Sequence, residues 1–169
     1  MNKIEKDIDI VIREDEGGYI ETWDKYGGKT YAGISIKDNP TAAAINTPKM
    51  AINWYKIWLE RVGIDSLREW QRKTVISAAI LVGPQRAVKI LQKSLNMRGK
   101  QIDGIWGPKT KRAVQIRPWD SADYGVHWVL DLLEHTNENA ENKYMHGWLN
   151  RIKRRCFAPN ETNRRLYLR

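Results

Sequence analysis

The feature that most constrains this chain is an apolar helical run that stops abruptly at two consecutive glycines. Four apolar residues recur at helical spacing: Ile4, Ile8, Val11 and Ile12. The run closes on Glu14-Asp15-Glu16, and Gly17-Gly18 follows. Glycine permits left-handed backbone and close approach of other groups. The pattern predicts a helix over residues 3–16 that ends at Glu16, where a carboxyl group is partly shielded from water yet can reach a substrate.

Helical periodicity dominates the rest of the chain, apart from one short segment. Residues 17–36 alternate aromatic, glycine and β-branched residues, which predicts a short hairpin or irregular sheet with a turn at Tyr26-Gly27-Gly28. Further helices are expected from Pro48 to Gly63, after a cap at Asp65 or Ser66, from Pro84, from Pro108, over 121–135 and over about 141–155. Residues 75–82 are apolar nearly all round, as in a buried central helix. We expect a mainly α fold with a small β-hairpin region after the first helix.

Composition narrows the class of protein. The 169 residues suit one domain, or one domain with a small subdomain, and include a single cysteine, so no internal disulfide is expected. Acidic residues occupy the N-terminus where a signal peptide would be apolar, and no segment approaches the roughly 20 apolar residues that span a bilayer. The three histidines are too scattered for a metal site. We expect synthesis in the cytoplasm, no metal and no cofactor.

Charge and tryptophan content point to the kind of partner. The net charge is +9, and seven lysines and arginines crowd the last twenty residues. Such a segment is either a solvated tail or a surface that attracts nucleic acid, anionic lipid or an anionic cell-wall polymer. Of the eight tryptophans we expect at least five in the core and one to three lining a groove, since indole rings also stack on sugars and bases.

Two carboxylates near the glycines could hydrolyse a glycosidic bond. That reaction needs a protonated acid for the leaving oxygen and a second group that holds water or supports the cationic transition state. Glu16, at a helix end near aromatic residues, is the candidate for a raised pKa, and Asp24, in a polar loop, is the candidate to stay ionised. Thr30 could orient a water. The alternative is that both carboxylates are ordinary surface charges beside a tight turn.

The spacing of these residues resembles a known signature. Glu16-Gly17-Gly18-Tyr19 followed by Asp24-x-x-Gly27-Gly28-x-Thr30-x-x-Gly33-Ile34 is similar to the motif of glycoside hydrolase family 108 N-acetylmuramidases. These comprise phage endolysins and bacterial muramidases once called secretion activator proteins. The resemblance implies a lysozyme-like helical fold, cleavage between N-acetylmuramic acid and N-acetylglucosamine, and Glu16 as catalytic acid. Trp23 stands where a proline is common, and two residues separate Asp24 from the glycine pair where one is usual.

A second motif lies in the other half of the chain. Leu91-Gln92-x-x-Leu95-Asn96 followed by Asp103-Gly104-Ile105-Trp106-Gly107-Pro108-Lys109-Thr110 resembles the family's predicted peptidoglycan-binding region, and Tyr144-x-x-Gly147-Trp148-Leu149-Asn150-Arg151 resembles its usual close. This implies a muramidase region over 1–83 and a helical peptidoglycan-binding-like region over 84–169, packed into one globular unit. The segment 103–110 can equally be a helix-capping loop.

These interpretations combine into one expectation. The chain is a cofactor-free muramidase, most simply a monomeric phage endolysin that acts on peptidoglycan after release by a holin-like protein, without nucleic acid or membrane insertion. Glu16, Asp24 and Thr30 carry the catalysis, and four aromatic residues are expected to contact sugar: Tyr19, Trp23, Tyr31 and Trp106. A lytic transglycosylase that leaves an anhydro-sugar end and a non-catalytic basic protein that binds nucleic acid or the cell wall are the alternatives.

Overall fold

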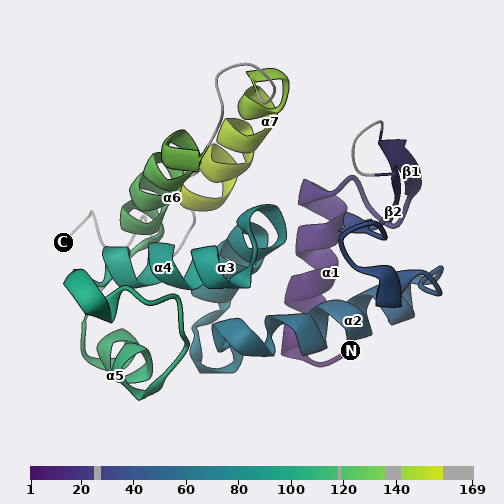
Figure 1. The fold of residues 1–169 in the computed structure, drawn as a ribbon. Coiled ribbons are helices and arrows are strands. Elements are labelled where there is room, and N and C mark those ends of the chain that lie inside the picture. Colours follow the sequence, from purple (N-terminus) through teal and green to yellow (C-terminus); the bar gives the residue numbers. More distant parts are fainter. Residues whose placement is uncertain (25–27, 118, 136–141, 158–169) are drawn as a thin grey trace.

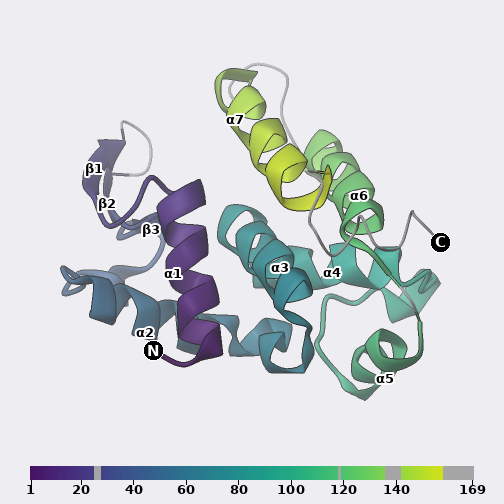
Figure 2. The same cartoon turned by 180° about the vertical axis from the view of Figure 1, so that it is seen from behind.

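The computed structural model describes residues 1–24, 28–117, 119–135 and 142–157. Within these ranges the chain is mainly helical with one small antiparallel sheet, as Figure 1 and the reverse view in Figure 2 show, so the fold predicted from the sequence is confirmed. The described helices are α1 (Lys3–Asp15), α2 (Pro48–Leu59), α3 (Glu69–Val82), α4 (Pro84–Ser94), α5 (Pro108–Ile116), α6 (Ser121–His135) and α7 (Asn142–Ile152).

Helix α1 is fixed at both ends by its own sequence. Asn2 caps the N-terminus, and its side chain and that of Glu5 exchange hydrogen bonds with each other's backbone N–H. At the other end the N–H groups of Glu16 and Gly18 both donate to the Ile12 carbonyl, at 3.1 and 3.0 Å. Gly17 and Gly18 have φ of 75° and 96°, which side chains disfavour. The glycine pair therefore ends the helix at Asp15 and leaves Glu16 as its C-cap residue.

The sheet follows directly and contains β1 (Glu21–Asp24), β2 (Gly28–Tyr31) and β3 (Ile34–Ser35) in that spatial order. Thr22 pairs with Thr30 across β1 and β2, and Tyr31 pairs with Ile34 across the tight β2–β3 turn. Most of the predicted turn at 26–28 lies outside the described residues. Figures 1 and 2 both place this sheet and α7 on opposite sides of the C-terminal end of α1.

Two helix starts test the expected caps. Thr47 caps α2 by accepting the Met50 N–H at 3.3 Å, with Pro48 in the first turn, as predicted. The predicted cap at Asp65 or Ser66 is wrong. Both residues belong to a 3-10 turn (Ile64–Ser66) that begins after the left-handed Gly63, and α3 starts later at Glu69. There the side chain of Gln71 accepts the Arg68 N–H at 3.0 Å.

The core forms around α3, whose residues 74–79 are all buried, as its all-round apolar sequence predicts. Helix α3 packs against α1 on one side and α4 on the other, and α4 packs against α6. The predicted boundary between residues 1–83 and 84–169 falls at Gly83, between α3 and α4. Because α3 and α4 pack against each other, contacts cross this boundary, and the division into two regions stays a prediction. Among the described residues, no helix is long and apolar enough to cross a bilayer.

The tryptophans follow the expected division. Trp119 and Trp128 are buried, and five more are partly buried against the core: Trp54, Trp58, Trp70, Trp106 and Trp148. Trp23 on β1 is 77% exposed. Single exposed aromatic residues beside a sheet edge are available to a ligand, whereas the buried ones stabilise the fold.

Candidate active site

Glu16 lies at the junction of α1 and the sheet, with its side chain only 16% exposed. The turn between β2 and β3 closes over it. A Cβ added to Gly33, whose φ is 78°, would lie 2.5 Å from Oε2 of Glu16. Only glycine therefore lets the backbone approach the carboxylate this closely. The turn is one wall of the environment of Glu16.

A buried tyrosine holds that turn in place. Tyr55, on α2 and 2% exposed, donates its hydroxyl hydrogen bond to the Ala32 carbonyl at 2.9 Å. Ala32 itself has a φ of 51°, an uncommon conformation for a residue with a side chain. Through Tyr55, helix α2 thus holds the β2–β3 turn in place, and the turn limits the position of the Glu16 side chain.

Arginine 151 approaches Glu16 from the opposite side. Its Nη2 lies 2.8 Å from Oε1 of Glu16, and the same guanidinium donates to the Asp15 carbonyl at 2.7 Å. Burial raises the pKa of Glu16, Arg151 opposes that rise, and the nearby charge of Asp15 adds to it. The net pKa is raised, because desolvation of the carboxylate outweighs the attraction of one cation.

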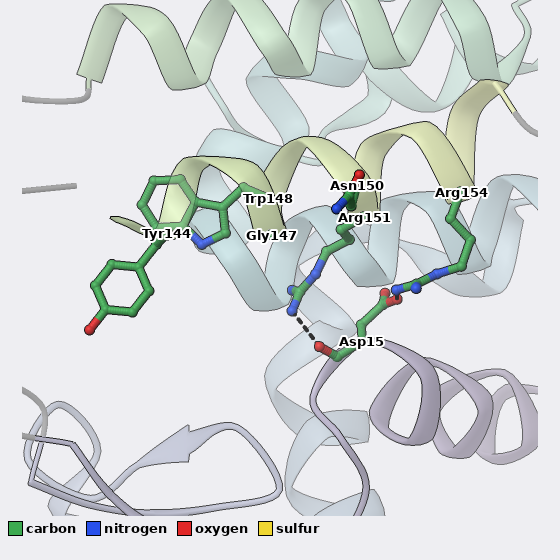
Figure 3. Close-up of a pocket in the computed structure, with 7 residues that line it drawn as sticks. All are labelled: Asp15, Tyr144, Gly147, Trp148, Asn150, Arg151 and Arg154. Carbon is green, nitrogen blue, oxygen red and sulfur yellow. Dashed lines mark hydrogen bonds and ion pairs between the residues drawn. The ribbon is translucent and has the colours of Figure 1, made fainter. Parts of the chain in front are cut away.

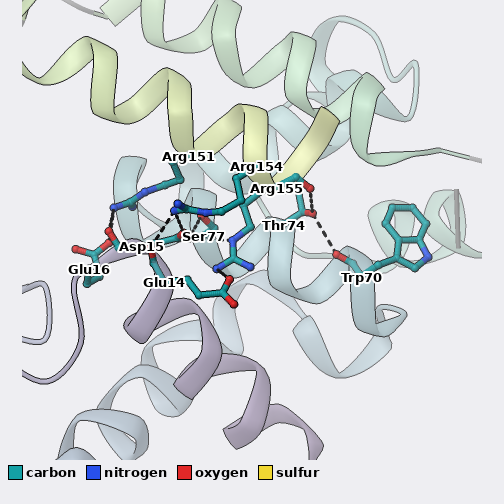
Figure 4. A network of polar contacts seen from close by, with 9 residues as sticks. All are labelled: Glu14, Asp15, Glu16, Trp70, Thr74, Ser77, Arg151, Arg154 and Arg155. Carbon is teal, nitrogen blue, oxygen red and sulfur yellow. Dashed lines mark hydrogen bonds and ion pairs between the residues drawn. The ribbon is translucent and has the colours of Figure 1, made fainter. Parts of the chain in front are cut away.

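Asp15, the neighbouring carboxylate, has a different environment. Its side chain is fully buried, and it pairs with Arg154 at 2.5 Å and Arg155 at 3.1 Å while accepting from the Ser77 hydroxyl at 2.5 Å (Figure 4). Burial alone would raise the pKa of Asp15, but Arg155, Ser77 and Arg151 together lower it below its usual value. Asp15 is therefore an ionised structural group.

The three carboxylates that end α1 each pair with an arginine of α7 or of the π-helical segment Lys153–Phe157. Arg155 completes the set by reaching Glu14 at 2.9 Å. Three of the seven basic residues that the sequence places at the C-terminus are thus internal ion-pair partners. For Arg151, Arg154 and Arg155, the solvated-tail interpretation is wrong, because consecutive acids on α1 attract them. Arg164, Arg165 and Arg169 lie outside the described residues.

The other two predicted catalytic residues lie on the sheet. Asp24 is the last residue of β1 and pairs with Gly28, and its side chain is outside the described part of the chain. Thr30 is half-buried on β2, and its hydroxyl lies 2.5 Å from the Thr22 hydroxyl across the strands. Thr30 lies two positions before the β2–β3 turn that contacts Glu16, whereas Asp24 and Gly28 pair at the other end of the β1–β2 hairpin.

The predicted sugar contacts separate into different environments. Trp23 is exposed on β1, beside Asp24. Tyr31 is 8% exposed and belongs to the core. Tyr19 donates to Asp9 at 2.6 Å, and Arg13 lies 5.2 Å from its ring centroid, so that ring is held against α1.

Trp106 lies elsewhere, in the loop before α5. Its ring fills the space in front of Gly63, where a Cβ would collide with the indole. It lines a cavity of about 490 Å³ together with residues of the 3-10 turn Glu60–Val62 and of the start of α4. That cavity shares no lining residue with the one beside Asp15 described below. The structure therefore does not bring Trp106 to Glu16.

The motif around Trp106 is organised by one buried amide. Gln92, on α4, donates to Asp103 at 2.8 Å and to the Thr110 hydroxyl at 3.0 Å, and accepts the Gly104 N–H at 2.9 Å. These contacts explain the spacing of the motif, since Gln92 ties the loop and the first turn of α5 to α4. They favour the interpretation of 103–110 as a structural helix-capping loop.

A second cavity, of about 270 Å³, lies along α7 beside the end of α1 (Figure 3). Its lining residues are Asp15, Tyr144, Gly147, Trp148, Asn150, Arg151 and Arg154. Arg151 connects it to Glu16, because the same guanidinium lines the cavity and pairs with that carboxylate. The aromatic residues here, Tyr144 and Trp148, were not among the predicted sugar contacts.

Sequence reasoning also missed Tyr55 and the role of Arg151. No local pattern marks Tyr55, which is one of several aromatic residues on α2. Gly33 and Arg151 both belong to the motifs described above. The sequence alone does not show that Arg151 is the ion-pair partner of Glu16, because the two residues meet only in the fold. Among the described residues, no cluster of three or more histidine, cysteine or acidic side chains suits a metal ion.

A mainly helical chain whose first helix ends on a buried carboxylate, followed at once by a small antiparallel sheet, is consistent with a lysozyme-like fold. Among solved structures the chain is similar to SagA of Brucella abortus, with a TM-score of 0.73 and 25% sequence identity over 91% of each chain. No protein-family model matches the sequence. No curated protein matches it either.

Proposed function

We propose that this protein is a peptidoglycan hydrolase that cleaves the β-1,4 bond between N-acetylmuramic acid and N-acetylglucosamine, with Glu16 as the general acid. The observation that carries the proposal is the position of Glu16, whose nearly buried carboxylate lies against the Gly33 turn at the junction of α1 and the sheet, where burial raises its pKa. A general acid must still hold its proton near the working pH, and burial achieves this for carboxyl groups.

The division of labour between adjacent carboxylates supports the choice of Glu16. The side chain of Asp15 is fully buried, engaged by two arginines and a serine, and has a lowered pKa, so it stays ionised and is unsuited to donate a proton. Glu16 has one cationic partner and retains some exposure. In this proposal Arg151 orients the carboxyl group of Glu16 and limits how far its pKa rises.

Asp24 and Thr30 take the second role in the proposed reaction. Asp24 is the group that holds the attacking water or supports the positive charge on the sugar ring, and Thr30 assists it from the neighbouring strand. The support for this role is that both residues belong to the small sheet, whose second strand leads into the turn that contacts Glu16.

The similarity to SagA adds support from outside the chain. That name is consistent with the secretion-activator muramidases whose motif the sequence resembles, and the similarity extends over 91% of both chains. A muramidase of either phage or bacterial origin acts outside the cytoplasm. The proposal accordingly places the action of this protein at the cell wall. It also includes that another protein helps it to reach the wall and that it acts there as a monomer.

Mass analysis of digested peptidoglycan tests the proposal. Purified wall material incubated with the wild-type protein should release disaccharide-peptide fragments with ordinary reducing N-acetylmuramic acid ends, and Glu16→Gln protein should release almost none. Fragments with anhydro ends, lighter by one water, would instead identify a lytic transglycosylase. Intact wall after incubation with folded wild-type protein would contradict an enzymatic function altogether.

A further inference from the structure

The cavity along α7 has a composition typical of carbohydrate sites. Tyr144 and Trp148 lie one helical turn apart, with ring centroids 6.2 Å apart and an interplanar angle of 20°, so they form a stacked pair. Figure 3 shows both rings projecting from the α7 face that also carries Arg151. A flat aromatic face with polar neighbours matches a sugar ring, which has an apolar face and a polar rim.

Gly147 keeps that face open. It lies between the two aromatic residues in the middle of α7, where glycine destabilises a helix relative to alanine. A Cβ added to it would meet no atom within 4 Å. Neither a positive φ nor a close contact in the described chain requires glycine here. The missing side chain leaves space beside the ring pair.

The charges of the cavity favour a neutral ligand. Both arginines that line it are already paired, Arg151 with Glu16 at 2.8 Å and Arg154 with Asp15 at 2.5 Å. Asn150 adds an uncharged side chain that can donate and accept hydrogen bonds. A polyanion such as nucleic acid requires unpaired cations to displace its counterions, and the described lining offers none.

The size and place of the cavity complete the argument. At about 270 Å³ it lies near the lower limit for small-molecule sites, which suits one ring rather than a chain. Arg151 is shared between this cavity and the proposed acid, so a ring bound here is adjacent to the bond that Glu16 would protonate.

We propose that the α7 face formed by Tyr144, Gly147, Trp148 and Asn150 binds one N-acetylated hexose ring of a glycan strand next to Glu16. The ring stacks on the aromatic pair, and Asn150 bonds its polar substituents. The identity of the ligand rests on the proposed function, but the binding face itself rests on the geometry of α7.

Filling the open space tests this without damaging the core. Gly147→Leu places a side chain across the face, and Gly147→Ala is the matched control that strengthens the helix but leaves most of the space free. Binding of tetra-N-acetylchitotetraose to each protein is measured by titration of tryptophan fluorescence and by calorimetry, with the Glu16→Gln background preventing turnover. Thermal unfolding verifies that both variants are folded.

We expect Gly147→Leu to weaken binding on the order of 10- to 100-fold, as for loss of a central aromatic contact, and Gly147→Ala to bind within about twofold of the parent. Equal binding by the leucine variant and the parent would overturn the proposal, as would a parent that binds no tetrasaccharide. Binding of a DNA duplex that is lost in Gly147→Leu would overturn it too. If binding depends on Gly147 but Glu16→Gln retains full wall lysis, the proposed function fails and this site stands.

Discussion

The two sides of the C-terminal end of α1 are held in different ways. On the side of α3 and the C-terminal segment, Asp15 accepts a hydrogen bond from Ser77 and forms ion pairs with Arg154 and Arg155. Glu16 meets the bare backbone of Gly33 on the side of the sheet and pairs with one guanidinium, that of Arg151 on α7. Consecutive residues thus have pKa shifts of opposite sign. The protonation of a buried carboxyl group is decided by the balance between desolvation and the cations and hydrogen-bond donors beside it.

The largest expected effect is on chemistry at the sheet side. Glu16→Gln keeps the shape of the side chain but cannot donate a proton, so wall lysis should fall by about 10²- to 10⁴-fold or more. Turbidity loss of a purified wall suspension measures it. Circular dichroism and thermal unfolding should match the wild type. Folded Glu16→Gln protein with more than a tenth of the wild-type rate would remove Glu16 from the catalytic role.

The arginine side should respond in stability instead. Asp15→Asn leaves two guanidinium groups without their buried partner, a change that costs about 3–5 kcal/mol in the free energy of unfolding. Denaturant unfolding measures it. Glu69→Gln is the control, because it breaks an exposed ion pair with Lys73 that is worth at most about 1 kcal/mol. Similar losses in both variants would show that the Asp15 cluster contributes no more than a surface pair.

The same carboxylate predicts a pH dependence. Because the folded pKa of Asp15 is lowered, its contribution to stability is complete above the unfolded value, near 3.8, and is lost as the pH falls through the folded value. Wild-type protein should therefore lose stability below about pH 4 more steeply than Asp15→Asn. Parallel acid unfolding curves for the two proteins would contradict the assignment.

A smaller effect is expected from the turn that contacts Glu16. Gly33→Ala has a left-handed backbone cost of roughly 1–2 kcal/mol and also pushes a methyl group against the carboxylate. Gly28→Ala has the same backbone cost, since its φ is 69°, but meets nothing within 4 Å. Both variants should lose similar stability, and only Gly33→Ala should lose activity, on the order of 10- to 100-fold from displacement of the acid. Equal activities would mean that the turn does not position Glu16.

Local patterns predicted most of the fold and the position of Glu16 at the end of α1. The end of α1 at Glu16 and the start of α2 at Pro48 could be predicted from the sequence, because glycine, proline and capping residues within a few positions determine them. The start of α3 could not, because the left-handed Gly63 begins an extra turn that delays the helix to Glu69. Glu16 was identifiable for the same local reasons.

Partners that are distant in sequence could not be predicted. Arg154 and Asp15 are 139 positions apart, and nothing local distinguishes an arginine that pairs with a buried acid from one in a basic tail. Tyr55 contacts Ala32 through a fold that brings α2 beneath the sheet. The acidic residues at the end of α1 were the available signal, since three consecutive carboxylates at a helix C-terminus are unfavourable unless cations approach them.

The most direct test of the account is a titration of the two carboxyl groups by carbon-13 NMR, with Glu16→Gln used to assign the resonance. The groups facing Glu16 are Arg151, Asp15 and Tyr55, and burial dominates over them. Removing the cation in Arg151→Met should raise the pKa of Glu16 further and move the alkaline limb of wall lysis to higher pH. In the wild-type protein we predict a pKa for Glu16 above its ordinary value of 4.5 and a pKa for Asp15 below 3.8. A Glu16 that titrates at or below 4.5 would show that the ion pair with Arg151 outweighs burial, and it would contradict its role as the proton donor.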